Sequence, residues 1–349
     1  MNFQKKHIVI LVVVLLNFVF GYTQDKSRFI KKNGGDLRNA MIAEDELGYI
    51  WIKGPEGLIK FDGYNFNLNP YPSILSTDSN SDIGHQFAKD SQGNLWLSSV
   101  AGDLLKIDKD GNYTSFKENT KYANISCISS VQNTLWFGSE KGSLFNYDHS
   151  SKKLEEIAQL PKLNNASQLI RSIVGIDSNT VWISTFSGKV YSFSKASNTL
   201  TPLLLPELAF LQEVKLSSDP EGYLWMATES RGLLKYNLET NKVTRKYGEI
   251  ETRANFSKYA MFISIMMDRS GIIWASTDGD GLYKINTRDN HVSIFKNNSN
   301  NDFSISNNTI ISVYEDRNRN IWAISKKGEI NILPKNNASI NYFSGSEDN

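Results

Sequence analysis

The sequence predicts an all-β fold, a seven-bladed β-propeller of four-stranded antiparallel blades. Three observations support this prediction. A β-rich unit recurs with a period of 40 to 49 residues, each copy carries the same turn residues, and the segments between the turns alternate as strands do. Units of four strands repeated around an axis are propeller blades. Each copy contains one tryptophan: Trp51, Trp96, Trp136, Trp182, Trp225, Trp274 and Trp322.

Turn residues stand at fixed distances from these tryptophans. An aspartate precedes five of them by six residues: Asp45, Asp90, Asp219, Asp268 and Asp316. Three residues before the tryptophan we expect positive φ at Gly48, Gly93, Gly222 and Gly271, with Asn133 and Asn179 as substitutes and Arg319 as the exception. The aspartate caps backbone amides and the glycine supplies the positive φ, so this spacing predicts a tight turn between two strands.

Each unit then divides into four predicted strands. The first precedes the turn, as in 40–45, 85–90, 213–219 and 310–316, and the second carries the tryptophan. A glycine follows the tryptophan by six or seven residues and opens the third strand, as in 58–62, 104–108 and 282–286. The fourth strand is a further β-rich segment, as in 113–116, 242–247, 291–295 and 339–343. We expect the seven tryptophans to pack between adjacent blades as structural residues.

Residues 1–24 have the pattern of a secretory signal peptide. Two lysines precede an apolar run of about fourteen residues, which is followed by GYTQ. The run is shorter than the roughly 20 residues of a transmembrane helix, although an uncleaved anchor remains an alternative. The domain division is therefore a signal peptide at 1–24 and a propeller at 25–349, with no membrane span in the mature chain.

The composition excludes several classes of partner and site. Loss of the signal peptide removes two lysines and no acids, so the net charge falls from +1 to −1. Nucleic acids and anionic lipids select basic proteins, which argues against both. The single cysteine, Cys127, lies in an apolar segment and is expected to be buried and inert.

The blade pattern resembles the two-component regulator propeller repeat. Its pattern is Asp-x-x-Gly-x-(Ile/Leu)-Trp, then Gly-Leu and an aromatic or aliphatic strand. Residues 43–66 resemble the opening blade of hybrid two-component sensors, residues 304–325 resemble a later blade, and the likeness covers about 27–349. It implies a periplasmic sensor. In that family the propellers form two rings, followed by a β-sandwich, a membrane helix, a kinase, a receiver and a DNA-binding domain.

This chain departs from the family pattern because it ends after seven blades. It has no second hydrophobic segment and no kinase motifs. It is therefore expected to be either a truncated reading frame or a free binding module. Ring closure is also open: residues 339–343 can form the outer strand of the last blade, but we predict that residues 27–31 approach that blade and clasp the ring.

An enzymatic role is not expected. Catalytic propellers need acids, histidines or metal ligands that converge on one face, whereas His85, His149 and His291 fall in different blades. Asp278 and Asp280 resemble a metal loop but lack the additional oxygen ligands of a calcium site. We therefore predict no metal and no cofactor.

A ligand is expected on the face that carries the loops entering the first strands and the loops joining second to third strands. The predicted ligand residues are Arg38, His85, Arg171, Lys215, Arg231, Tyr259 and Asp278, with Gln86, Glu213, Lys53, Glu56, Phe186 and Lys326 as further loop positions. Aromatic, amide and charged groups of this kind suit an oligosaccharide or another small ligand.

Two alternatives remain. One is an envelope assembly or secretion component that binds a protein partner or a surface polysaccharide. The other is pairing with a second propeller or a dimer partner.

Overall fold

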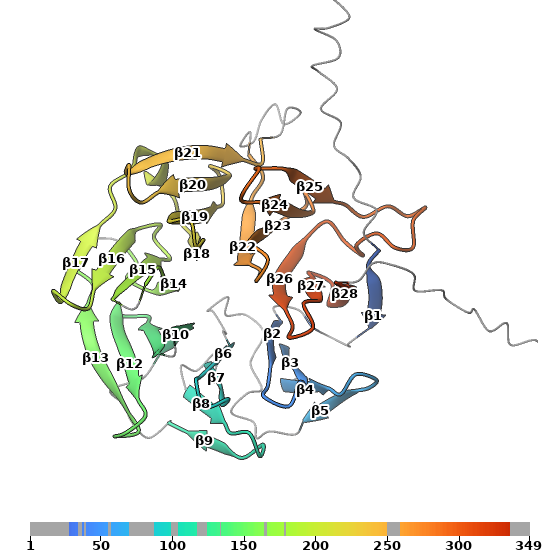
Figure 1. Ribbon diagram of the computed structural model, residues 1–349, viewed down its shortest axis with the longest axis horizontal. Coiled ribbons are helices and arrows are strands. Elements are labelled where there is room, and N and C mark those ends of the chain that lie inside the picture. The colour runs from blue at the N-terminus through green and yellow to red at the C-terminus, as the bar shows by residue number, and fades with distance from the viewer. Residues whose placement is uncertain are drawn as a thin grey trace, which may run out of the picture.

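The computed structural model describes residues 28–33, 37, 40–54, 57–69, 87–98, 104–116, 124–132, 134–163, 166–177, 179–249 and 259–335. These residues form seven four-stranded antiparallel sheets around a central axis (Figure 1). The predicted all-β, seven-bladed propeller is therefore confirmed. The predicted signal peptide, the strand predicted at 339–343 and five single positions lie outside the described residues: Arg38, Glu56, His85, Gln86 and Asn133.

Blades 1 to 4 follow one another in chain order. Blade 1 contains β2 (Met41–Glu44), β3 (Ile50–Gly54), β4 (Gly57–Phe61) and β5 (Phe66–Asn69). Blade 2 contains β6 (Phe87–Lys89), β7 (Leu95–Ser98), β8 (Leu104–Ile107) and β9 (Tyr113–Ser115). Blade 3 contains β10 (Ile125–Val131), β11 (Thr134–Ser139), β12 (Ser143–Asp148) and β13 (Lys153–Gln159). Blade 4 contains β14 (Ile170–Gly175), β15 (Thr180–Thr185), β16 (Val190–Ser194) and β17 (Thr199–Pro202).

Blades 5 to 7 complete the ring. Blade 5 contains β18 (Val214–Ser218), β19 (Tyr223–Thr228), β20 (Leu233–Asn237) and β21 (Lys242–Tyr247). Blade 6 contains β22 (Phe262–Met267), β23 (Ile272–Thr277), β24 (Leu282–Asn286) and β25 (Val292–Phe295). Blade 7 contains β26 (Ile310–Glu315), β27 (Ile321–Ser325), β28 (Glu329–Leu333) and β1 (Ile30–Asn33). A short 3-10 helix, η3 (Pro206–Leu208), lies between blades 4 and 5.

The ring is closed inside blade 7, where strands from the two ends of the described chain pair. β1 runs antiparallel to β28 and places Ile30 opposite Ile332. Phe29, just before β1, is 2% exposed and packs edge-on against Phe295 of blade 6. The predicted clasp by residues 27–31 is therefore confirmed from Arg28 onward, because β1 is the outer strand of the last blade (Figure 1).

The tryptophans lie on the second strand of each blade and face the next blade. Trp51 packs with Leu95 and Leu97 of blade 2, and Trp322 packs with the residues of blade 1 across the closing seam. Six of the seven are at most 4% exposed, and Trp182 is half-buried. Burying indoles of this size between sheets is a large part of what holds adjacent blades together.

The aspartate of the turn has a second role that the sequence did not predict. Asp219 Oδ1 accepts the backbone N–H groups of Glu221 and Tyr223, both at 3.0 Å. Its other oxygen, Oδ2, accepts the indole N–H of Trp225 at 2.8 Å. The same indole bond is present at Asp45, Asp90, Asp268 and Asp316. One carboxylate therefore fixes both the turn and the tryptophan, which explains their six-residue spacing.

The turn glycines have positive φ as predicted, but two other turn positions differ from expectation. Gly48, Gly93, Gly222 and Gly271 have φ between 80° and 93°. Arg319, the expected exception, takes the same conformation with φ of 65°. Asn179 does not have positive φ, because Asp177 begins its turn one residue later than the aspartates of the other blades and caps the amides of Asn179 and Thr180.

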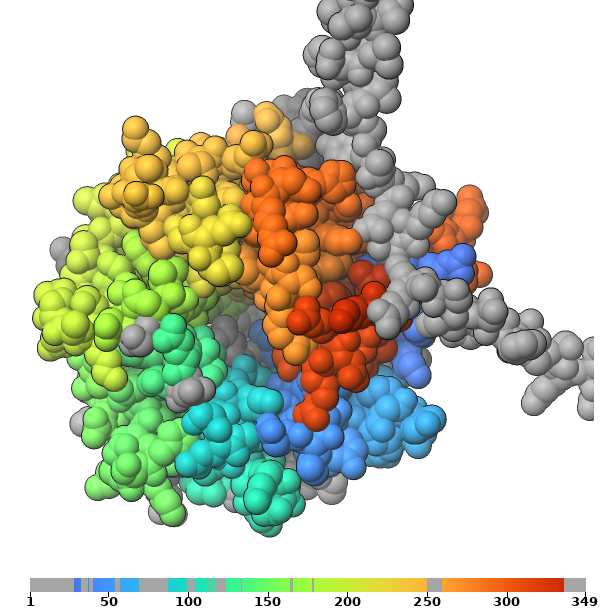
Figure 2. Space-filling model, in the orientation of Figure 1, coloured from blue at the N-terminus to red at the C-terminus, as the bar shows by residue number. Residues whose placement is uncertain are grey.

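Antiparallel pairing divides the connections between two faces. The turn face carries the turns from first to second strand and from third to fourth strand. The loop face carries the loops from second to third strand and the connections between blades. The first strands of all the blades lie nearest the axis, and in space-filling view successive blades are in contact around the ring (Figures 1 and 2).

The single cysteine lies in the interior of the propeller. Cys127 is fully buried, and burial raises the pKa of its thiol to about 12, so the thiolate is absent near neutral pH. Among the residues that the structure describes, no helix is long and apolar enough to cross a membrane.

Candidate functional site

Three charged side chains meet on the loop face, at the inner strands of blades 4 and 5. Arg171 belongs to β14, Glu213 directly precedes β18, and Lys215 belongs to β18. Arg171 Nε donates to Glu213 Oε1 at 2.5 Å, and this oxygen lies 3.6 Å from Lys215 Nζ. Lys215 Nζ also donates to the main-chain oxygen of Ile263 in β22 at 2.6 Å. This charged cluster therefore joins three successive blades.

The cluster has a net charge of +1 near neutral pH. Burial acts to raise the pKa of the Glu213 carboxyl, but Lys215 and Arg171 together outweigh it and hold the pKa below its ordinary value. Burial, assisted by the charge of Arg171, lowers the pKa of the Lys215 ammonium to about 8. Two cations and one anion are therefore present below that pH, all of them partly exposed to solvent.

Two exposed phenylalanines come from loops next to the cluster. Phe186 lies in the loop between β15 and β16, and its N–H donates to the main-chain oxygen of Leu169, two residues before Arg171. Phe210 lies in the connection between blades 4 and 5, three residues before Glu213. The side chains are 42% and 98% exposed. Phe210 therefore shares its connection with Glu213, and Phe186 lies in a loop that is hydrogen-bonded to the chain just before Arg171.

The sequence contains a signal for Phe210 that lies outside the blade pattern. Residues 203–211 contain an apolar run that no predicted strand accounts for. In the structure Leu208 and Leu211 are buried beneath this connection, whereas Leu204 and Phe210 are exposed. An apolar run outside the blade pattern is therefore the signal for this part of the loop face.

Asp278 and Lys326 form a second charged group, between blades 6 and 7. Asp278 Oδ1 accepts the hydroxyl of Thr309 at 3.0 Å and lies 3.8 Å from Lys326 Nζ. The neighbouring Asp280 is buried, and its N–H donates to the hydroxyl of Thr277. Within the described ranges, no three His, Cys, Asp or Glu side chains are placed to hold a metal ion.

Arg231 lies in the loop between β19 and β20 of blade 5, and Tyr259 lies in the connection from blade 5 to blade 6. Arg231 is exposed, and its N–H donates to the hydroxyl of Thr228 at 3.0 Å. The adjacent Gly232 packs so closely on Tyr259 that an added Cβ would lie 2.9 Å from the ring. The predicted ligand residues that the structure describes therefore form three groups on successive blades: Arg171 with Lys215, Arg231 with Tyr259, and Asp278 with Lys326.

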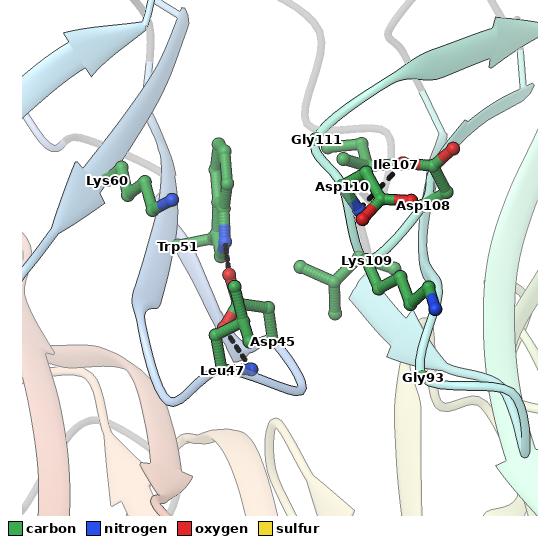
Figure 3. Close-up of a pocket in the computed structure, with 11 residues that line it drawn as sticks. Asp45, Leu47, Trp51, Lys60, Gly93, Ile107, Asp108, Lys109, Asp110 and Gly111 are labelled. Atoms are coloured by element: carbon green, nitrogen blue, oxygen red, sulfur yellow. Dashed lines mark hydrogen bonds between the residues drawn. The ribbon is translucent and has the colours of Figure 1, made fainter.

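A pocket on the opposite face contains none of the predicted ligand residues. It lies between blades 1 and 2, with the turn at Asp45 and Leu47 on one side and the turn at Asp108 on the other (Figure 3). Asp45 accepts the indole N–H of Trp51, and Asp108 Oδ1 accepts two backbone N–H groups of its own turn. Lys60 Nζ lies 3.7 Å from the centre of the Tyr49 ring. These carboxylates serve the fold, so the loop face is the better candidate.

Solved structures with the same fold include extracellular domains from B. thetaiotaomicron. One is that of BT4673, named a one-component system in one structure and a hybrid two-component system in another. Its identity with this chain is 21% and the TM-score is 0.68, over 88% of this chain and 40% of that chain. The extracellular domain of the hybrid two-component system BT3049 is 20% identical to this chain with a TM-score of 0.67. The match covers 88% of this chain and 42% of that chain.

This chain has the propeller fold of those extracellular domains. It spans about 40% of the length of the BT4673 domain. The fold is shared more widely, since the WD40 propeller domain of Doa1 matches with 12% identity and a TM-score of 0.61 over 88% of this chain and 96% of that chain. No protein-family model and no curated protein sequence matches the chain.

Proposed function

We propose that this chain is an exported, non-catalytic sensor propeller of the two-component regulator type, and that it binds a glycan fragment on the loop face. The charged cluster of Arg171, Glu213 and Lys215 is the observation that carries the proposal. The repeat pattern of the sequence and the fold shared with the BT4673 and BT3049 domains support a role in sensing. The apolar segment at 7–20 supports export to the periplasm.

The chemistry of the cluster matches that of a sugar. Hydroxyl groups both donate and accept hydrogen bonds, so they can accept from Arg171 and Lys215 and donate to Glu213. Bonds to charged groups are stronger than bonds between neutral groups. The exposed rings of Phe186 and Phe210 add apolar surface beside these polar groups. A binding surface of this kind recognises a ligand and needs no catalytic group.

Calorimetry tests the proposal. The exported chain is titrated with a panel of gluco-, xylo-, arabino- and galacto-oligosaccharides, and at least one is expected to bind. Arg171→Gln should weaken that binding about tenfold or more, because it removes a charged donor. Lys242→Gln is the matched control, because Lys242 is an exposed cation on the outer strand β21. Binding should also weaken as the pH rises through about 8, where Lys215 loses its proton.

Two outcomes would contradict the proposal. One is that no oligosaccharide in the panel binds. The other is stoichiometric capture of one envelope protein by the loop face without any bound sugar, which would favour the assembly alternative. The exposed Leu204 and Phe210 side chains are the apolar groups that such a protein partner would cover.

A further inference from the structure

Phe210 combines two unfavourable features. Its φ is 63°, in the left-handed region that bulky side chains rarely adopt, and its side chain is 98% exposed. The strained backbone is not compensated by burial of the ring. Residues in such conformations persist only when the surrounding structure imposes them, and they concentrate at ligand-binding sites.

The surrounding connection does impose this conformation. Leu208, in η3, and Leu211 are buried on either side of Phe210. The N–H of Gln212 donates to Glu229 Oε1 at 2.9 Å. Gly188 packs against Leu211 so closely that an added Cβ would lie 2.4 Å from the Leu211 main-chain oxygen. The chain is thus held on both sides of Phe210, which leaves the ring directed to solvent.

The same contacts place Phe210 near the charged cluster. Glu213 follows three residues later and binds Arg171 at 2.5 Å. Gly188, which touches Leu211, lies two residues after Phe186, and Phe186 is itself hydrogen-bonded to Leu169 beside β14. Phe210 therefore lies in the connection that supplies the carboxylate of the cluster, and Phe186 lies in a loop that contacts this connection.

We propose that Phe210 is the stacking surface of the ligand site and packs against the apolar face of one pyranose ring, with Phe186 next to it. The charged cluster then binds hydroxyl groups at the edge of the same sugar. This inference rests on the proposed function and adds the residue that selects for a flat, ring-shaped ligand. An aromatic ring offers large contact area with little loss of side-chain entropy, which suits a weakly apolar sugar face.

The decisive variant is Phe210→Gly, because it removes the ring and relieves the backbone strain together. We expect its melting temperature to equal or exceed that of the wild type, while the dissociation constant for the oligosaccharide found by calorimetry rises about tenfold. Phe210→Trp should retain binding. Tyr64→Ala is the matched control, since Tyr64 is 87% exposed but lies on the turn face, and this variant should bind as the wild type does.

The outcomes separate this inference from the proposed function. Unchanged affinity of Phe210→Gly for a sugar that the wild type binds would overturn the stacking role and leave the sensor proposal intact. A lower melting temperature of Phe210→Gly would show that the ring stabilises the fold. If the wild type binds no sugar in the panel, both proposals fail, and loss of an envelope-protein partner by Phe210→Gly would assign the ring to a protein contact.

Discussion

At the scale of single residues, the aspartate of the turn shows how one side chain links local structure to packing. Its two oxygens serve different partners: Oδ1 caps the turn, and Oδ2 holds the indole that fills the seam to the next blade. In blade 5 both Asp219 and Trp225 are at most 5% exposed. Loss of the second acceptor would leave a buried indole N–H without a partner, which costs more than the hydrogen bond itself contributes.

Asp219→Asn tests this double role. The amide oxygen of the substituted side chain can still cap the turn, but its NH2 group then faces the indole N–H, so two donors meet. We expect a loss of roughly 2 kcal/mol in the free energy of unfolding, measured with urea. Asp177→Asn is the matched control, because Asp177 is exposed and caps a turn in blade 4 without binding an indole. Equal losses in the two variants would contradict the role of the indole bond.

Lys53 is a second residue whose setting is unusual. It stands two residues after Trp51, where the other blades carry Ser98, Gly138, Ser184, Ala227, Ser276 and Ile324. Its side chain is 3% exposed, and burial lowers the pKa of its ammonium to about 7. Within the described parts of the chain, no carboxylate lies within ion-pair distance of it. The folded protein therefore holds this proton less tightly than the unfolded chain does.

Lys53→Met should remove the resulting pH dependence. Between about pH 7 and about pH 10 the unfolded chain binds the proton that the folded protein has lost, so the free energy of unfolding rises with pH across that window. The stability advantage of Lys53→Met over the wild type is then greatest below about pH 7 and decreases toward about pH 10. Urea denaturation of both proteins across this range measures the difference. A constant difference would contradict the lowered pKa.

At the scale of the strand, the clasp decides whether blade 7 is complete. β1 supplies its outer strand, and Phe29 brings a buried ring into the seam with blade 6. The N–H of Phe29 also donates to the main-chain oxygen of Phe303 at 2.9 Å. Without β1 the edge of β28 would be exposed, and an uncovered strand edge promotes aggregation.

Deletion of residues 25–33 should therefore lower the melting temperature by several degrees. The deletion removes the pairing of β1 with β28 as well as the buried Phe29 ring. Lys31→Ala is the control, because Lys31 is an exposed residue of the same strand and its backbone pairing is kept. A melting temperature that is unchanged by the deletion would mean that another segment covers β28.

The sequence predicted the strands well because their signals are local. Turn residues and alternation lie within a few positions of each tryptophan, as in the turn from Gly222 to Trp225. The conformation of Arg319 was not predictable from its residue type, since the turn capped by Asp316 gives it φ > 0 although arginine does not favour that region. The charged cluster was harder to predict from the sequence than the strands. Arg171 and Glu213 are 42 residues apart and meet only because β14 and β18 are neighbours in the ring.

At the scale of the whole molecule, charged residues beside the turn aspartates join successive blades. The residue after one aspartate pairs with the residue before the aspartate of the next blade. Arg269 binds Glu315 at 3.0 Å and Arg317 binds Glu44 at 2.6 Å, across the seams from blade 6 to 7 and from blade 7 to 1. At the seam from blade 1 to 2 the charges are reversed, and Glu46 lies 3.2 Å from Lys89.

The three pairs occupy the same position of the repeat but differ in burial, so they should contribute differently to the free energy of unfolding. Glu44 is buried, with 7% of its side chain exposed, and it also accepts the backbone N–H of Arg317. The side chains of Glu46 and Lys89 are about half exposed, at 58% and 43%. Solvent and salt screen an exposed pair, whereas a buried carboxylate that loses its partner is left uncompensated.

Arg317→Met should consequently destabilise the ring far more than Lys89→Met does. We expect a loss of roughly 3 kcal/mol in the free energy of unfolding for the first variant, because Glu44 stays buried without its cation. For the second we expect less than about 1 kcal/mol, a loss that shrinks further in high salt. Urea denaturation at low and high ionic strength measures both. Similar losses in the two variants would show that the pairs act only through surface charge, and the closing seam would then depend on β1 and the apolar core of blades 7 and 1 alone.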